Sequence, residues 1–145
     1  MNEANIFEFD AIVIGAGVIG LAIANEISDN FDNVLLVEKE PEFGQHVSSR
    51  HSGVIHSGIY YDSNSLKAKL CVEGNKLLYD FCEENTVDYL NCGKLIVGHN
   101  DEDLIKLIEL KNKGILNGVK GLEILNSEEA KEKERFVKCR NALWV

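Results

Sequence analysis

Residues Asp10–Gly20 read DAIVIGAGVIG, and a second apolar run, Val34–Val37, leads directly into Glu38. A strand that enters a helix through Gly-x-Gly-x-x-Gly, with an acid at the end of the next strand, is typical of a dinucleotide-binding unit. The apolar run before Gly15 predicts a buried parallel strand, and the apolar spacing over 18–27 predicts a helix. An ordinary buried strand and helix with incidental glycines is the alternative, which this context disfavours.

Each residue of this fingerprint has a chemical reason. Gly15 turns the chain tightly, Gly17 lets backbone N–H groups approach a pyrophosphate, and Gly20 allows close packing of helix and strand. The helix N-terminus carries unpaired N–H donors and a partial positive charge, so it attracts the phosphates. Glu38 is expected to accept hydrogen bonds from ribose hydroxyls, and its charge disfavours an NADP-type cofactor with a ribose 2′-phosphate.

The composition predicts a globular protein and excludes several functions. The 145 residues are 45% hydrophobic, and 15 basic against 24 acidic residues give a net charge of −9. This charge disfavours binding to nucleic acid or anionic lipid. The longest uncharged apolar stretch, 11–24, is too short to span a bilayer and follows no basic segment, so we expect neither a transmembrane helix nor a signal peptide.

The four cysteines have no C-x-x-C spacing. Cys71 and Cys82 lie on the apolar side of one helical pattern. Buried, reduced thiols of a cytosolic protein are therefore expected.

The rest of the chain predicts further elements after the β-α-β start. In chain order these are a long functional loop over 40–65, a helix over 66–83, a strand within 89–98, a helix over 101–113 that Gly114 stops, a short strand over 122–125, a short helix with Ser127 as its N-cap, and a strand over 142–145. That last strand is expected to lack its partners, and no further parallel strand with a crossover helix completes the dinucleotide fold. We therefore expect the N-terminal part of a larger enzyme; a complete small domain is the alternative.

A second constellation, SSRHSGVIHSGIYY over 48–61, is dense in glycines and hydrogen-bonding side chains. Such a loop suits a flat polar ring system, and Arg50 offsets phosphate or anionic flavin charge. His46, His51 and His56 recur every five residues, which does not place them on one helix face. Because no cysteine or acid joins them at a metal-site spacing, a metal site is disfavoured. Ordinary histidines satisfied by hydrogen bonds remain the alternative for each of them.

Together these motifs resemble the L-2-hydroxyglutarate oxidase/dehydrogenase family, which belongs to the D-amino-acid-oxidase-like group of FAD-dependent oxidoreductases. The motifs that carry the resemblance are DAIVIGAGVIGLAIA, VLLVEKE, SSRHSGVIHSGIYY, SLKAKLCVEGNKLLYDFC and CGKLIVG. The resemblance extends from residue 10 to about residue 145. It implies an α/β fold, with the N-terminal part of a Rossmann-like FAD-binding domain over 1–88 and the start of a substrate domain over 89–145.

The resemblance also implies roles for individual residues toward FAD. The three fingerprint glycines would hold the pyrophosphate, Glu38 the adenosine ribose and Lys39 the edge of the adenine, while 49–53 would run toward the isoalloxazine. His56 is the candidate catalytic base. The complete set assigned to cofactor binding is Gly15, Gly17, Val18, Ile19, Gly20, Glu38, Lys39, Ser49, Arg50, His51, Ser52 and Gly53.

The implied reaction is oxidation of a 2-hydroxy acid, above all L-2-hydroxyglutarate, to the 2-oxo acid. Hydride would pass to flavin N5 while a histidine takes the hydroxyl proton. Arg50, Lys67 and Lys69 are the few cations here for the two substrate carboxylates. Electrons would leave to oxygen or to a quinone-linked carrier, in a cytoplasmic protein that is free or peripheral to the membrane through that acceptor.

Two alternatives stay open. One is a flavoenzyme of the same group that oxidises an amino acid, an amine or glycerol 3-phosphate. The other is a truncated dinucleotide-binding module that catalyses nothing by itself. In either case we expect the isolated 145-residue chain to be inactive.

Overall fold

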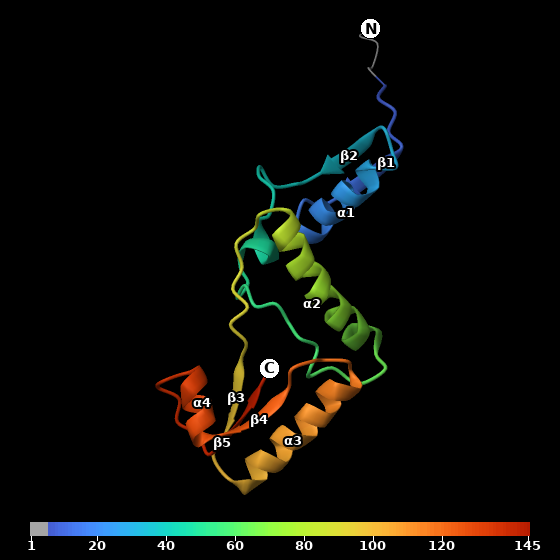
Figure 1. Ribbon diagram of the computed structural model, residues 1–145. Coiled ribbons are helices and arrows are strands. Elements are labelled where there is room, and N and C mark those ends of the chain that lie inside the picture. Colours follow the sequence, from blue (N-terminus) through green and yellow to red (C-terminus); the bar gives the residue numbers. More distant parts are fainter. Residues whose placement is uncertain (1–5) are drawn as a thin grey trace. The chain divides into compact units, whose positions relative to one another are not determined.

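The short strands of this chain form two separate sheets, and helices alternate with the strands along the sequence (Figure 1). The computed structural model describes residues 6–145, which form two compact units divided between Val54 and Ile55. The elements in chain order are β1 (Ala11–Ile14), α1 (Val18–Ser28), β2 (Val34–Val37), the 3-10 turn η1 (His46–Ser49), α2 (Leu66–Glu84), β3 (Leu95–Gly98), α3 (Asp101–Leu116), β4 (Glu123–Asn126), α4 (Ser127–Lys133) and β5 (Asn141–Trp144). The predicted α/β class with a parallel start is confirmed. The predicted domain boundary after residue 88 stays a prediction.

In the first unit, β1 and β2, which precede and follow α1 in the sequence, pair in parallel, as the fingerprint predicts. Gly15 leaves β1 with a φ of 103°, a left-handed conformation that side chains rarely adopt, and its N–H donates to the carbonyl of Val37 at 2.7 Å. A Cβ on Gly20 would stand 1.8 Å from the carbonyl oxygen of Gly15. The third fingerprint glycine is therefore required by the close approach of α1 to the turn that precedes it.

In the second unit, β5 is the middle strand of an antiparallel sheet, with β3 on one side and β4 on the other. Leu143 lies opposite Ile96 of β3 and Ile124 of β4, and it is fully buried. The prediction of a terminal strand without partners is wrong. The run over 142–145 is apolar because its side chains pack in the core, where Ala142 and Leu143 are fully buried.

Helix α3 continues through Gly114 to Leu116, so the prediction that this glycine stops the helix is wrong. Gly114 is buried, and a Cβ there would stand 2.6 Å from Leu122 Cδ1 and 2.9 Å from Ile59 Cγ1. Its place is set by packing: the helix needs a residue without a side chain where two apolar side chains press against it.

Asn126, rather than the predicted Ser127, is the N-cap of α4. Its Oδ1 accepts hydrogen bonds from the backbone N–H groups of Glu128 at 2.9 Å and Glu129 at 3.0 Å, and Glu129 Oε2 accepts from Asn126 N at 2.7 Å. This reciprocal arrangement is a capping box. Ser127 is the first residue of the helix itself.

Two clusters of buried side chains lie beside the second sheet. One contains Ile59, Leu107 and Leu143, and the other contains Leu125, Ala130 and Ala142. All four cysteines are free. Cys82 is buried as expected, whereas Cys71 and Cys139 are half-buried and Cys92 is exposed. Burial raises the pKa of the Cys71 thiol. Within residues 6–145, no helix combines the length and the apolar character needed to cross a membrane.

Candidate cofactor-binding site

The N-terminus of α1 is the candidate anion site. Gly17 is the N-cap and supplies no side-chain cap, and the first turn of the helix contains no acidic residue. Val18 and Ile19 begin the helix with exposed side chains, while their backbone N–H groups belong to the end that has no intrahelical acceptors. An anion would meet a positive helix end that no carboxylate of the helix itself neutralises.

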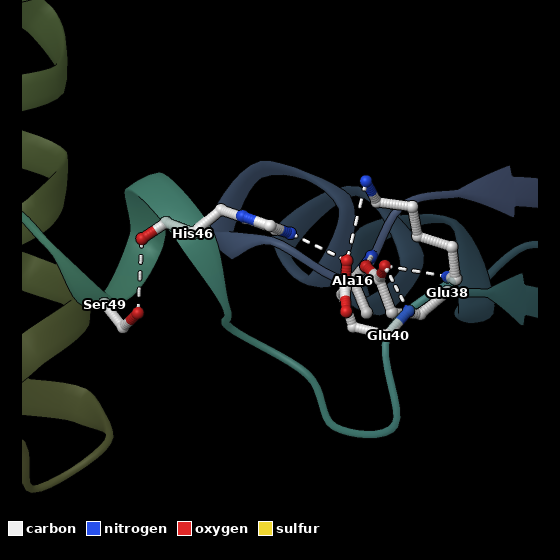
Figure 2. A network of polar contacts seen from close by, with 6 residues as sticks. Ala16, Glu38, Glu40, His46 and Ser49 are labelled. Carbon is white, nitrogen blue, oxygen red and sulfur yellow. Dashed lines mark hydrogen bonds and ion pairs between the residues drawn. The ribbon is translucent and has the colours of Figure 1, made fainter.

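Glu38 holds the fingerprint loop through its carboxylate (Figure 2). Oε2 accepts from the backbone N–H of Ala16 at 2.7 Å, and Oε1 accepts from those of Lys39 at 2.8 Å and Glu40 at 3.1 Å. These bonds, that from Ala16 foremost, lower the pKa of Glu38. A carboxylate has about four acceptor positions, so about one is left for a ribose hydroxyl.

Ser48 is the site residue that sequence reasoning missed. Its Oγ accepts a hydrogen bond from the backbone N–H of Val18 at 2.9 Å, and a Cβ on Gly17 would stand only 3.1 Å from that oxygen. The predicted neighbour, Ser49, instead donates to the carbonyl of His46 in its own turn at 3.2 Å (Figure 2). Two adjacent serines give the same sequence signal, and only the register of the turn decides which one meets the helix.

A hollow of about 500 Å³ opens at this place in the first unit. It is bordered by the fingerprint loop, the end of β2 and the turn η1. The lining residues are Ile14, Gly15, Gly17, Val37, Glu38, Lys39, Gln45, His46, Val47 and Ser48. The structure thus brings together two fingerprint glycines, the predicted acid and the predicted lysine.

A second polar cluster borders the hollow. His46 Nε2 lies 2.8 Å from Glu40 Oε1, and Lys39 Nζ lies 3.5 Å from the same oxygen. The hydrogen bond from His46 is the main cause that lowers the pKa of Glu40. The predicted role of Lys39 beside an adenine stays a prediction, since its side chain is 78% exposed.

The predicted segment from Arg50 to Gly53 does not line this hollow. Its residues are exposed, and the local contact is from Gly53 N to His51 Nδ1 at 2.9 Å. Gly53 has a φ of 68°, which only glycine adopts freely. The assigned contacts of Arg50, His51, Ser52 and Gly53 with FAD stay predictions.

His56 lies in the second unit, with an exposed side chain and an anchored backbone. Its carbonyl oxygen accepts from Asn75 Nδ2 at 3.2 Å and from Cys71 Sγ at 3.5 Å, both on α2. Helix α2 thus fixes the position of this residue, and the ring stays accessible.

A family model described as FAD dependent oxidoreductase matches residues 10–145. Curated relatives include L-2-hydroxyglutarate dehydrogenases, named mitochondrial, of Homo sapiens (42% identity; 99% of this chain, 31% of the relative), Dictyostelium discoideum (46%; 83% and 28%) and Arabidopsis thaliana (46%; 92% and 28%). The chain thus spans about a third of their length or slightly less. The resemblance expected from the motifs is confirmed.

Solved structures share the fold. An FAD-bound L-alpha-glycerophosphate oxidase from Mycoplasma pneumoniae matches with a TM-score of 0.81 and 32% identity, over 94% of this chain and 37% of that chain. A glycine oxidase from Geobacillus kaustophilus matches with a TM-score of 0.77 and 21% identity, over 94% and 39%. With the family match, the first of these confirms FAD as the cofactor expected from the sequence.

The expectation of a cytoplasmic protein is wrong. The names of the relatives from animals, a slime mould and a plant all point to mitochondria. That expectation rested on free cysteines and on a missing export signal, and both properties are equally compatible with a mitochondrial enzyme.

Proposed function

The chain belongs to the family of FAD-dependent oxidoreductases, and we propose that it forms part of an enzyme that oxidises L-2-hydroxyglutarate to its 2-oxo acid. The observation that carries this proposal is the 42–46% identity to relatives with that name over 83–99% of the chain. The glycerophosphate oxidase, at 32% identity, supports glycerol 3-phosphate as the second candidate substrate.

The first unit would hold the AMP half of FAD. The N-terminus of α1 suits the pyrophosphate, because Gly17 places no side chain over it, the first turn has no acidic residue, and Ser48 Oγ, which accepts from Val18 N, can itself donate to a phosphate oxygen. The last acceptor position of Glu38 suits a ribose hydroxyl, and Lys39 stands at the edge where adenine would enter. The helix end and Glu38 thus provide the hollow with donors for a diphosphate and an acceptor for a ribose hydroxyl.

His56 would take the hydroxyl proton of the substrate. FAD, when bound, supplies the two-electron acceptor for the hydride of the substrate carbon. An exposed imidazole whose backbone is held by Asn75 and Cys71 is positioned and free to accept a proton. Lys67, which lies over the Tyr61 ring at 4.3 Å, would offer one cation for a substrate carboxylate.

The cofactor is tested on the complete gene product, purified gently and supplied with FAD. A flavin absorbance spectrum is expected, and its absence would refute the proposal. Anaerobic addition of L-2-hydroxyglutarate should bleach the flavin, whereas D-2-hydroxyglutarate, glycine and glycerol 3-phosphate should not. Bleaching by glycerol 3-phosphate alone would replace the first candidate by the second.

The proton-transfer role is tested with His56→Asn. This variant should bind FAD normally and reduce it about 10²- to 10⁴-fold more slowly, the usual contribution of a general base. Flavin reduction at the wild-type rate would remove His56 from the reaction. Reoxidation of the reduced enzyme with oxygen or with a quinone analogue then distinguishes the two acceptors.

A further inference from the structure

We propose that Glu40 and His46 form a positioning pair, which holds Ser48 against the N-terminus of α1 and thereby sets the affinity for FAD. The inference rests on the proposed cofactor site. It concerns two side chains to which neither the fingerprint nor the resemblance assigns a role.

The turn η1 begins with an unfavourable backbone conformation. His46 has a φ of 60°, a left-handed value that non-glycine residues adopt rarely and at a free-energy cost. Such a conformation persists only where the surroundings hold it. The side-chain contact that His46 makes is the 2.8 Å bond between its Nε2 and Glu40 Oε1.

Polar contacts join the turn to the fingerprint in a closed ring, of which Figure 2 shows the contacts among Ala16, Glu38, Glu40 and His46. In order around the ring they are Ala16 N to Glu38 Oε2 (2.7 Å), Glu40 N to Glu38 Oε1 (3.1 Å), His46 Nε2 to Glu40 Oε1 (2.8 Å), and Val18 N to Ser48 Oγ (2.9 Å). A further bond ties the segment down at 2.8 Å, from Gly44 N to the carbonyl of Ala16. Within this ring, the pair is the side-chain link between the segment after β2 and the turn.

The pair lies where it can affect the ligand. His46 and Ser48 both line the hollow, and the Glu40 side chain is only 29% exposed, with Lys39 on its other side. If the pair is broken, the turn is released, and FAD must order it again on binding. Ordering a loop on binding costs affinity, and a loop that is already fixed avoids that cost.

The test measures the FAD dissociation constant of the complete gene product, stripped of flavin, from flavin fluorescence. His46→Asn removes the ring but keeps a residue that tolerates a positive φ. We expect this variant and Glu40→Ala each to raise the constant about tenfold. Glu40→Gln, whose amide oxygen still accepts from the imidazole, should raise it only about threefold.

Two further readouts separate positioning from general stability. The double variant His46→Asn/Glu40→Ala should bind FAD no more weakly than either single variant, because both remove one contact. The Val18 amide should exchange hydrogen faster in each single variant without FAD. Glu42→Gln is the matched control. Glu42 lies in the same segment, is exposed, and has no ion pair among the described residues. The FAD dissociation constant of this variant should match that of the wild type.

The failures are distinguishable. A wild type without FAD binding refutes the proposed function. If the wild type binds FAD and His46→Asn and Glu40→Ala bind it just as tightly, the positioning pair is overturned and the cofactor site still holds. The same follows if the losses of affinity in the two single variants add up in the double variant. A His46→Gly variant that binds as tightly as the wild type also overturns the positioning pair, because the pair would then only offset the strain at residue 46.

Discussion

The hydroxyl of Ser48 accepts a hydrogen bond from the backbone N–H of Val18 at 2.9 Å, across 30 residues of sequence. It occupies one donor of the helix end where we propose that the pyrophosphate binds, and its own proton remains available to a phosphate oxygen. Ser48 is thus placed to extend the helix N-terminus toward the ligand.

Replacing the two serines should separate their roles. Ser48→Ala removes the hydroxyl at the helix end, and we expect the FAD dissociation constant to rise about five- to tenfold, the effect of one lost hydrogen bond. Ser49→Ala, whose hydroxyl bonds within its own turn, should change it less than twofold. Equal effects in the fluorescence titration would contradict this assignment.

Gly17→Val should abolish FAD binding. A Cβ at this position would already stand 3.1 Å from Ser48 Oγ, and the two methyl groups of valine would cover the N–H groups of the helix end. Circular dichroism should show a folded protein, while the flavin spectrum is lost. Full flavin occupancy in this variant would place the pyrophosphate elsewhere.

Acid should lower the affinity for FAD by protonating Glu38. Its pKa is lowered in the folded protein by the hydrogen bond from Ala16 first and by those from Glu40 and Lys39. A carboxylate with a lowered pKa contributes stability that is fully present above its ordinary titration range and is lost as pH falls below that range, through the lowered pKa. FAD release followed over this range should be steeper in the wild type than in Glu38→Gln, which cannot titrate. Identical profiles would exclude this role of the carboxylate.

Two glycine-to-alanine variants should change stability in opposite directions. At Gly114 the added Cβ would meet Leu122 and Ile59, so we expect a loss of about 1–3 kcal/mol from overpacking. At Gly74, within α2, a Cβ would meet no atom within 4 Å, so the better helix propensity of alanine should add about 0.5–1 kcal/mol. Urea unfolding of the two variants measures both, and a stabilised Gly114→Ala would refute the packing explanation.

The capping box of α4 gives a similar comparison. Asn126→Ala removes the acceptor of two backbone N–H groups and should cost about 1 kcal/mol in the free energy of unfolding. Ser127→Ala, at the first helical position, should change it by less than about 0.5 kcal/mol. If Ser127→Ala were the more costly variant in thermal melts, the cap would lie one residue later than the structure places it.

Most local elements could be predicted because their signals are local. The apolar run before Gly15 and the spacing over 66–83 gave a strand and a helix within a residue of their observed ends. The errors at Gly114 and over 142–145 share a cause, which is contact with distant residues. Gly114 resembles a helix stop until Ile59 and Leu122 are packed against it, and the run over 142–145 has no visible partners until two strands pair with it.

The residues of the candidate site also fall into those that the sequence could predict and those that it could not. The glycines and Glu38 were predictable, because the phosphate and the ribose require those residue types at those spacings. Ser48 was not, because its role depends on a turn whose register is set by the left-handed His46 and its bond to Glu40. The sequence marks both residues only as polar members of a loop.

The central place of β5 has a consequence for biosynthesis. Strands β3 and β4 do not pair with each other, and each finds its partner only in Asn141–Trp144. A ribosome delivers β3 and β4 before β5, so the second sheet stays open until β5 has left the exit tunnel. For that interval Ile96 and Ile124 lack their cross-strand neighbour Leu143, and a chain that ends before β5 cannot close this sheet.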